Sequence, residues 1–519
     1  MAVTEDALRD ERIRDAIDEE RSREEREAAI AELFDARIFR ENAELVVARL
    51  ERYLADSSLR GLALTRPSSL LQAARDLMRA REDDSPGSFR KRLEAILDLY
   101  IETGIQVHSP GSMGRQFSGV IPLAGVFDLA SSIVNQPSSF YEAGQLPNVA
   151  ERLMAEELSR LLGWNGDQSA MVTTSGGSLA NLTALLAARN DKLPGSWSRG
   201  LAGGEPGQRP AIAVSEDVHY CVPRAAGILG VGDEQIVRLP IDRRRRIVVD
   251  EVGPSLDRAA ADGLRVFCLV ASAGTTSFGA FDPLDELAAI AEERDVWFHV
   301  DGAHGASLLV SDELRHKLKG IERADSFAWD AHKLMFVPAM CSLLFYKDKA
   351  KAHGAFHQQA SYVFEKEPDD YTAYDSAGKN FECTKRPLIM NLWVLWALYG
   401  RQAFATKIEH LCELSQRAYG ALEEAPDFEP LHRPEVNILC FRYLPANLSS
   451  SRFEDFQLAI RNRIRRGGRF FISKVDVDGV PVLRVVFMNH LTRLSHFRML
   501  LDEIRREGQA LLRADERDV

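Results

Sequence analysis

The sequence has few of the features that mark small metal-binding, secreted or membrane proteins. Its six cysteines are scattered between Cys221 and Cys440 without a CxxC pair, so no zinc ribbon, thioredoxin-type site or other metal site is predicted. Scattered cysteines are typical of a reducing compartment. The charged first 20 residues contain no apolar signal-peptide core, and the longest apolar run, 389–399, is too short to cross a bilayer. These absences predict a cytoplasmic protein without a membrane segment.

The chain also lacks an excess of positive charge. Its 65 lysines and arginines are outnumbered by 77 aspartates and glutamates, which gives a formal net charge of −12. A general nucleic-acid binder needs a basic surface that replaces the counterions of the phosphates. The arginine run at 243–246 is short, and we interpret it as a solvated loop. No nucleic-acid partner is predicted.

Hydropathy patterns divide the 519 residues into three parts. Residues 1–105 carry apolar side chains at helical spacing among many charges, which predicts an amphipathic helical segment. Residues 106–390 alternate short β-branched runs with helical stretches, and residues 391–519 begin with a long helical stretch. We therefore expect an N-terminal helical segment, a large α/β domain and a small C-terminal α+β domain with these boundaries.

The middle part is predicted to form a mainly parallel sheet with helices on both faces, because buried strands alternate with helices. The predicted elements are strands at 211–214, 266–270, 296–300 and 342–346 and a helix at 283–293. Ligands bind such sheets beyond the carboxyl ends of the strands. Residues that follow these strands are therefore the first candidates for a functional site.

The last part is predicted to combine helices with a β-hairpin. The predicted elements are a helix at 392–423, a strand at 437–443, hairpin strands at 470–475 and 482–487, and a final helix at about 496–512. The hairpin turn is placed at Asp478-Gly479, a pair that favours a tight turn with positive φ angles.

A loop of small residues, TTSGGSLAN at 173–181, precedes a helical run. Small side chains let backbone N–H groups approach a ligand closely, and the helix that follows directs its positive end at an anion. The loop matches neither a Walker A motif nor GxGxxG. Taken alone, it is equally compatible with a phosphate site and with a plain glycine-rich turn.

Two charged residues lie in apolar surroundings. Asp301 follows the predicted strand 296–300, and Lys333 precedes the apolar run 334–336. A buried carboxylate needs a partner such as a protonated pyridine, although a helix N-cap is the commoner role for such an aspartate. A buried lysine can become a nucleophile that forms a Schiff base, although a lysine at a strand end can also reach solvent.

The order of these three features resembles that of fold-type I pyridoxal-phosphate enzymes. The stretch SAGTTSFGAFDPLDELAAIAEERDVWFHVDGAHG from Ser272, together with ADSFAWDAHKL from Ala324, is similar to the group II decarboxylases. That family includes the glutamate, cysteine sulfinate, aromatic amino-acid and diaminobutyrate decarboxylases, and the similarity runs from about His108 to the C-terminal end. The resemblance implies the aspartate aminotransferase-like fold, with a mainly parallel seven-stranded sheet, and pyridoxal 5′-phosphate as cofactor.

The resemblance also implies roles for individual residues. Lys333 would hold the cofactor as a Schiff base, Asp301 would pair with the ring nitrogen, and His219 would stack on the ring, with Ala303 against its other face. The implied cofactor site comprises Gly177, Ser178, His219, Thr276, Asp301, Ala303, His332 and Lys333.

Three further residues match family positions that act on the substrate. Tyr362 resembles the mobile-loop tyrosine that protonates the reaction intermediate, and would join Lys333, His219 and Asp301 as a catalytic residue; an ordinary loop tyrosine is the alternative. Arg484, within an apolar strand, matches the arginine that grips the substrate α-carboxylate; an arginine that points from an edge strand to solvent is the alternative. Arg115 would neutralise an acidic side chain of the substrate.

Some positions depart from the family pattern. Asp330 stands where many relatives have asparagine, although bacterial sequences similar to diaminobutyrate decarboxylase share the aspartate, and a carboxylate there would repel the cofactor phosphate. His304 replaces an aromatic residue common in the family. The sequence assigns no role to either residue.

The expected activity is decarboxylation of an L-amino acid to the amine and CO₂. The ASYVF stretch at 360–364 favours the branch that acts on aspartate, cysteine sulfinate or glutamate. Diaminobutyrate or an aromatic amino acid is an alternative substrate, and aldehyde synthesis or transamination is an alternative reaction on the same fold. A catalytically inactive scaffold is the remaining alternative, against which the intact Lys333, Asp301 and His219 count. Because relatives are homodimers, a homodimer is expected.

Overall fold

The structure is a computed structural model that describes residues 5–80, 85, 87–201, 207–356, 371, 374–446, 448 and 452–515. The chain forms two compact units, one made of Met1–Ser57 and Ala63–Gly104 and the other of Ser58–Leu62 and Ile105–Val519. The large and the small predicted domain both lie in the second unit, and the boundary between them at residue 390 stays a prediction.

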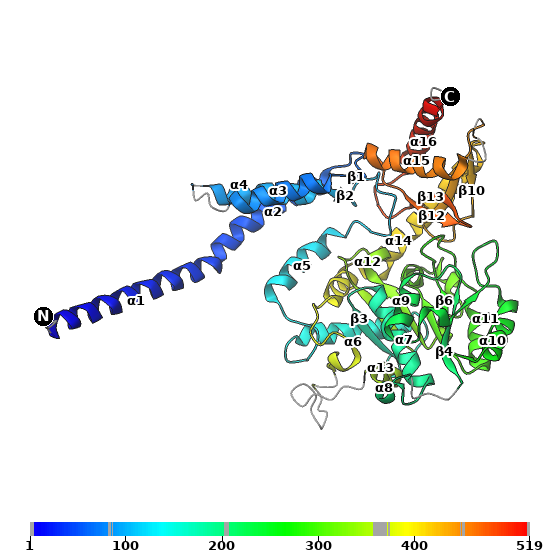
Figure 1. Cartoon of the computed structure of the whole chain (residues 1–519), viewed down its shortest axis with the longest axis horizontal. Coiled ribbons are helices and arrows are strands. Elements are labelled where there is room, and N and C mark those ends of the chain that lie inside the picture. Colours follow the sequence, from blue (N-terminus) through cyan, green and yellow to red (C-terminus); the bar gives the residue numbers. More distant parts are fainter. Residues whose placement is uncertain are drawn as a thin grey trace. The chain divides into compact units, whose positions relative to one another are not determined.

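The first unit is helical, as the amphipathic pattern predicted. Its helices are α1 (Glu5–Leu33), α2 (Ala36–Ala55), α3 (Pro67–Arg79) and α4 (Ser88–Glu102) (Figure 1). Asp35 caps α2, because its carboxylate accepts a hydrogen bond of 2.7 Å from the backbone N–H of Arg37. Two short strands, β1 (Leu62–Ala63) and β2 (Gly104–Ile105), lie where the chain passes between the two units.

The large sheet has seven strands in the order β3-β9-β8-β7-β6-β4-β5. The strands are β3 (Ala170–Thr174), β4 (Arg209–Ser215), β5 (Ile236–Leu239), β6 (Leu264–Ser272), β7 (Trp297–Asp301), β8 (Ser326–Asp330) and β9 (Ser342–Tyr346). From β8 to β5 all neighbours are parallel, whereas β9 is antiparallel to both β8 and β3. The sheet is therefore mainly parallel, as predicted, and β3 points in the same direction as β8.

Alternate side chains of this sheet enter two different apolar cores. In β9, Leu343 and Phe345 pack into one core and Leu344 packs into the other. In β6, Leu269 packs into the first of these cores and Val270 into the second. A strand that is buried on both faces has an almost continuous apolar sequence, which is why these strands could be recognised without a structure.

Helices cover both faces of the large sheet (Figure 1). They are α5 (Pro122–Val134), α6 (Gln145–Arg160), α7 (Gly177–Lys192), α8 (Ser196–Arg199), α9 (Cys221–Ile228), α10 (Val252–Ala261), α11 (Leu284–Glu293), α12 (Ala331–Leu334), α13 (Lys349–Gly354) and α14 (Ile389–Glu423). Helices α7, α9 and α13 supply side chains to one core, and α11 and α14 to the other. Helix α14 is interrupted at Gly400, whose φ of 71° breaks the helical path.

The small sheet is antiparallel, with the order β10-β11-β13-β12. Its elements are β10 (Phe428–Pro430), β11 (Ile438–Tyr443), β12 (Ser473–Val477) and β13 (Val480–Val486), with α15 (Phe453–Gly467) and α16 (Leu494–Asp515) packed beside them (Figure 1). The predicted turn is confirmed, since Asp478 and Gly479 have φ angles of 53° and 83°. One predicted boundary is wrong: 470–472 are not part of β12, because Phe471 pairs with the segment around Gly111 and Ser112 instead.

The arginine run at 243–246 is largely ion-paired. Arg245 contacts Asp217 through Nε at 2.7 Å, and Arg246 contacts Asp242 through Nη2 at 2.7 Å. Arg244 lies 3.7 Å from Glu435. These pairs leave little free positive charge in this loop. Separately, no helix in the described part of the chain has both the length and the hydrophobicity of a membrane span.

Candidate active site

The carboxyl ends of five strands meet at one edge of the large sheet. Strands β4, β6, β7 and β8 are parallel, and β3 shares their direction. A cavity of about 300 Å³ lies at this edge. Residues at or just after the strand ends line it, among them Ser175 after β3, Ser272 in β6 and Asp301 in β7. The cavity is therefore where a doubly wound fold binds its ligand.

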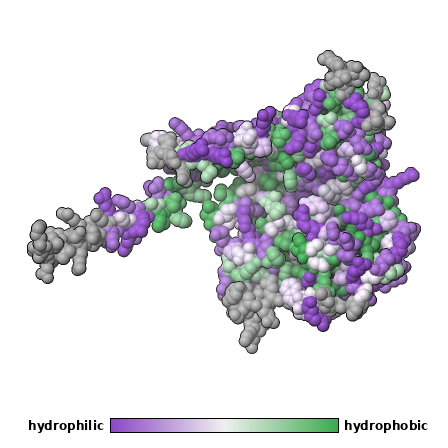
Figure 2. Space-filling model, viewed as in Figure 1, coloured by the Kyte–Doolittle hydropathy of each residue, from purple (hydrophilic) through white to green (hydrophobic). Residues whose placement is uncertain are grey.

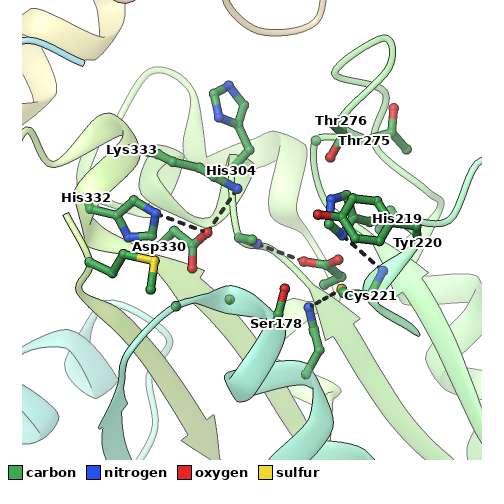
Figure 3. A pocket seen from close by; sticks show the side chains of 18 of the residues that line it. Ser178, His219, Tyr220, Cys221, Thr275, Thr276, His304, Asp330, His332 and Lys333 are labelled. Carbon is green, nitrogen blue, oxygen red and sulfur yellow. Dashed lines mark hydrogen bonds and ion pairs between the residues drawn. The ribbon is translucent and has the colours of Figure 1, made fainter. Parts of the chain in front are cut away.

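The residues expected to form the cofactor site come together here. The cavity is lined by Gly177, Ser178, His219, Thr276, Asp301, Ala303, His332 and Lys333, which is the complete predicted set. In Figure 3, Lys333 and His219 lie on opposite sides of the cavity, and Ser178 projects from the helix below them.

The small-residue loop forms the start of helix α7. Gly176 has a φ of 124° and a ψ of 154°, a conformation that essentially only glycine adopts. A Cβ atom at Gly177 would lie 2.8 Å from Oδ1 of Asp330, so a side chain there would collide with the carboxylate. Gly176 and Gly177 thus bring the start of α7 to the cavity without side chains of their own. This arrangement suits an anion such as a phosphate.

Asp301 is a buried carboxylate with spare hydrogen-bonding capacity. It ends β7, is 9% exposed, and its Oδ1 accepts a hydrogen bond of 3.2 Å from the N–H of Ala303. No described residue donates to its Oδ2 or forms an ion pair with it. A buried carboxylate is costly without a compensating donor or cation, so this oxygen is suited to a protonated group of a ligand in the cavity.

A chain of buried hydrogen bonds runs under the cavity. The indole N–H of Trp297 donates to Oγ of Ser326 at 2.9 Å, and that hydroxyl lies 2.8 Å from Nδ1 of His299. Nε2 of His299 lies 2.7 Å from Oδ1 of Asn181, whose amide N–H donates to Sγ of Cys221 at 3.4 Å.

The amide of Asn181 fixes the direction of the links to His299: its N–H donates to Cys221, so its Oδ1 faces His299 and accepts the proton on Nε2. Nδ1 of the neutral ring then accepts from the hydroxyl of Ser326, which in turn accepts from the indole of Trp297. Burial lowers the pKa of His299 to about 4, so this histidine is neutral at physiological pH. The chain holds Asn181, which also lines the cavity, in one orientation.

His219 is oriented by its own backbone. Its Nδ1 accepts a hydrogen bond of 3.3 Å from the N–H of Cys221, which leaves the other ring nitrogen to carry the proton of the neutral ring. Burial lowers the pKa of His219, and the nearby carboxylate of Asp301 partly opposes that shift. The ring of Tyr220 lies 4.2 Å from that of His219. A flat, neutral surface therefore covers one side of the cavity.

Lys333 lies in the short helix α12, and its side chain is 17% exposed. Its Nζ is 2.9 Å from Oδ2 of Asp330, the residue to which the sequence assigned no role. Figure 3 shows this pair beside His332, whose Nε2 lies 3.8 Å from the same oxygen. Of the described residues, Asp330 alone pairs with Lys333.

His304 links the cavity to the small sheet. Its Nε2 donates to Oδ1 of Asn437 at 2.7 Å, and this orientation of the amide is set because the Asn437 N–H donates to the carbonyl of Phe487 at 2.7 Å. Burial lowers the pKa of His304 to about 3, and the Lys333 charge acts in the same direction. The unprotonated Nδ1 is buried and accepts no hydrogen bond from a described residue. His304 thus keeps one neutral, buried acceptor without a described partner.

Arg484 is buried in the small sheet and does not line the cavity. Its Nε and Nη2 donate to the carbonyls of Ser277 and Thr276 at 3.0 and 2.5 Å, and its Nη1 donates to Oγ of Ser473 at 3.0 Å. Burial lowers its pKa to about 10, and no described carboxylate neutralises it. The solvent-facing alternative is wrong for this 5% exposed residue, which instead fixes the loop that carries Thr276.

Two further residues, Arg115 and Tyr362, were predicted to act on the substrate or in catalysis. Arg115 is exposed and does not line the cavity. Tyr362 lies outside the described residues, so its role stays a prediction.

Sequence reasoning missed several lining residues. They include Asn181, Tyr220, Cys221, Thr275 and Met340. Asn181 follows Gly177 by four positions on α7 and so shares its helix face, a signal that the sequence offered. Met340 reaches the cavity only through the fold of the loop before β9, for which the sequence gave no pattern.

The fold and this cavity define a pyridoxal-phosphate enzyme of fold-type I. The family model for the pyridoxal-dependent decarboxylase conserved domain matches residues 99–444, more than half of the chain. The chain belongs to the pyridoxal-dependent decarboxylases, and the predicted group II family is confirmed.

Known relatives agree in sequence and in fold. Cysteine sulfinic acid decarboxylase from Rattus norvegicus is 29% identical over 84% of this chain and 89% of its own length, and the Homo sapiens enzyme is similar to the same degree. The crystal structure of mouse CSAD superposes with a TM-score of 0.80 at 26% identity and covers 90% of this chain and 98% of its own. Oryza sativa TDC, crystallised with PLP and tryptamine, has a TM-score of 0.82 at 21% identity, covers 92% of this chain and 99% of its own, and supports the fold alone.

The residues present fit pyridoxal phosphate. The open N-terminal turn of α7 suits the phosphate, the unpaired Oδ2 of Asp301 suits a protonated ring nitrogen, and the Lys333 amine suits an aldehyde. These three groups all line the same cavity.

Proposed function

We propose that this protein decarboxylates an acidic L-amino acid of the cysteine sulfinate, aspartate and glutamate class to the corresponding amine and CO₂. The observation that carries the reaction is the convergence of the Lys333 amine, the open Asp301 oxygen and the start of α7 in one cavity. The similarity to cysteine sulfinic acid decarboxylases over 84% of the chain supports the acidic substrate class.

Each residue contributes a distinct task. Asp301 would hold a proton on the ring nitrogen through its open Oδ2, and His219 would cover the ring with a flat, neutral surface. When bound, pyridoxal phosphate supplies a protonated ring that accepts the electron pair left when CO₂ departs. Lys333 would anchor the cofactor through its amine and release it to the incoming substrate amine.

Three further tasks are assigned to Tyr362, Arg484 and Arg115. Tyr362 would deliver a proton to Cα after CO₂ has left, a step that separates decarboxylation to an amine from aldehyde formation. Arg484 would attract the substrate α-carboxylate, which is supported by its buried guanidinium without a described carboxylate partner. Arg115 would neutralise the negative charge of the substrate's acidic side chain once the substrate is bound.

The alternatives differ in their products. A diaminobutyrate or aromatic substrate would give a basic or aromatic amine, an aldehyde synthase would release ammonia and peroxide, and an aminotransferase would release no CO₂.

The proposal is tested by incubating the purified, cofactor-loaded protein with cysteine sulfinate, aspartate, glutamate, diaminobutyrate and tryptophan while CO₂ and amines are measured. An acidic amino acid should give CO₂ and amine in equal amounts. The Lys333→Ala variant should give neither, whereas Lys347→Ala, at an exposed lysine after β9, should match the wild type. Release of CO₂ from none of the five amino acids would contradict the proposal.

We also propose that the protein is a cytoplasmic homodimer. Leu33 and Phe34, at the junction of α1 and α2, are 81% and 84% exposed, and Figure 2 shows hydrophobic side chains on the surface of this unit. Such a surface favours an interface, and a second copy offers the same apolar surface in return. The six cysteines are all free, which supports a reducing compartment.

The dimer is tested by light scattering during size-exclusion chromatography. The wild type should have twice the mass of one chain, and Leu33→Ser with Phe34→Ser should shift the protein toward the monomer. Arg26→Ser, an exposed change on the same helix, should leave the mass unchanged. A monomeric wild type at micromolar concentration would contradict the dimer.

A further inference from the structure

Asp330 is a buried carboxylate at the point where a cofactor phosphate is expected. It ends β8 and is 3% exposed. Its Oδ1 accepts a hydrogen bond from the hydroxyl of Ser342, and its Oδ2 faces Nζ of Lys333 at 2.9 Å and Nε2 of His332 at 3.8 Å. Figure 3 shows Asp330 between these two side chains.

The same carboxylate lies against the start of α7. A Cβ atom at Gly177 would lie 2.8 and 2.9 Å from its two oxygens. The first turn of a helix has N–H groups without intrahelical acceptors and carries a partial positive charge. Asp330 therefore sits where the helix end, an ammonium and an imidazole all favour an anion.

Its surroundings keep Asp330 ionised. Burial by itself would raise the pKa of this carboxyl, but the charges of Lys333 and His332 and the Ser342 hydroxyl outweigh burial and lower the pKa below its usual value. A phosphate that binds at the α7 terminus consequently meets a negative charge already in place. Coulomb repulsion is strong in such a site, because little water screens it.

We propose that Asp330 is a built-in counter-anion that balances Lys333 and the α7 terminus in the cofactor-free enzyme and that weakens the binding of the cofactor phosphate. The inference rests on the proposed function, since it assigns the phosphate to this end of the cavity. It makes Asp330 a positioning residue that acts on the cofactor through charge. Replacing Asp330 by a neutral side chain should then strengthen the binding of phosphorylated ligands selectively.

The test compares two ligands that differ only in the phosphate. Pyridoxine 5′-phosphate and pyridoxine both lack the aldehyde, so neither reacts with Lys333, and their dissociation constants can be measured by calorimetry on the cofactor-free protein. Asp330→Asn should bind pyridoxine 5′-phosphate at least about tenfold more tightly than the wild type. Its affinity for pyridoxine should stay the same, a selectivity that a merely structural role would not produce.

A matched control lies at the other end of the same strand. Asp325 directly precedes β8 and is also largely buried, and its Oδ2 accepts a hydrogen bond of 2.8 Å from the N–H of Phe298. Asp325→Asn removes the same charge far along the strand from the α7 terminus and should leave both affinities unchanged. Asp330→Ser, with a smaller neutral side chain, replaces the asparagine variant if that protein does not fold.

The outcomes separate the inference from the proposed function. Equal or weaker binding of pyridoxine 5′-phosphate by both neutral variants at Asp330 would overturn the inference, and so would an equal gain in the Asp325 variant. If the folded wild type and all variants bind neither pyridoxine 5′-phosphate nor pyridoxal phosphate, the proposed function fails together with the inference.

Discussion

Two buried lysine–carboxylate pairs in this molecule differ in what surrounds the amine. Nζ of Lys385 lies 3.3 Å from Oε2 of Glu151 and donates at 2.7 Å to both the carbonyl and the hydroxyl of Thr173. Nζ of Lys333 lies 2.9 Å from Asp330 and has no second acceptor among the described residues. An ammonium has three N–H donors. Those of Lys385 all have acceptors, whereas Lys333 has one described acceptor.

The difference separates a structural pair from a reactive one. The Lys385 and Glu151 side chains are 2% and 6% exposed and line no described cavity, whereas Lys333 is 17% exposed and opens into one. An amine in a closed site whose N–H donors all have acceptors cannot reach a ligand. It contributes to the stability of the fold through the hydrogen bonds and the ion pair that it already makes. An amine beside a cavity, with N–H donors that have no acceptor, can exchange its partner for a substrate or a cofactor.

The largest effect, a loss of turnover, is expected when the reactive amine of Lys333 is removed. Lys333→Ala should lower turnover by at least about 1,000-fold, because the covalent anchor of the cofactor is lost. The melting temperature of the cofactor-free protein should fall as well, because the change leaves the buried Asp330 carboxylate without its ammonium partner. Steady-state CO₂ release and thermal denaturation measure the two quantities, and retained turnover would contradict the assignment of Lys333.

At the buried pair of Lys385 and Glu151, a loss of stability is expected. Lys385→Met should destabilise the fold by about 3–5 kcal/mol, because it leaves Glu151 buried without its cation. Denaturant unfolding measures the loss. Adding Glu151→Gln should recover part of it, whereas a loss that the second change does not reduce would show that the pair is not the cause.

The sequence identified the large sheet because its strands are buried on both faces and read as apolar runs. Strands β3, β5 and β8 were not among the predicted strands, and in β8 the polar residues Ser326 and Asp330 stand at the two ends. The roles of these two residues were not predicted either. Ser326 is polar because it relays a hydrogen bond between Trp297 and His299, a role that depends on packing between neighbouring strands.

The candidate cofactor residues were predictable because a continuous motif places them at the strand ends. The partners that orient them were not, because they come from distant parts of the chain. Asn437 reaches His304 across 133 positions, and Arg484 reaches the loop of Thr276 across 208. No local pattern encodes such contacts. Asp330 and Lys333 are only three positions apart, but the contact of Asp330 with the start of α7 became visible only in three dimensions.

A third buried carboxylate, that of Asp282, extends the comparison because no described lysine or arginine pairs with it. Asp282 accepts hydrogen bonds of 2.8 and 2.7 Å from the N–H groups of Ile247 and Ser272. Burial nevertheless raises its pKa from 3.8 to about 7. The folded state therefore binds one more proton than the unfolded state between these values, and its stability should fall as the pH rises from about 4 to about 7.

Asp282→Asn should remove this component of the pH dependence, because the amide does not titrate. Denaturant unfolding at several pH values between 4 and 7 measures it, with Asp250→Asn, at an exposed aspartate, as the control. An unchanged slope in the Asp282 variant would mean that hydrogen bonds to the two N–H groups keep this carboxylate ionised without a cation.

The smallest expected effect concerns the hydrogen-bond chain beneath the cavity. Ser326→Ala removes the hydroxyl between Trp297 and His299, and leaves a buried N–H and a buried ring nitrogen without partners. The fold should lose about 1–3 kcal/mol. Because the amide oxygen of Asn181 still accepts from Nε2, the ¹⁵N chemical shifts of the His299 ring should keep the pattern of a single Nε2–H tautomer. A mixture of tautomers in the variant would mean that the Ser326 hydroxyl is needed to keep the proton on Nε2.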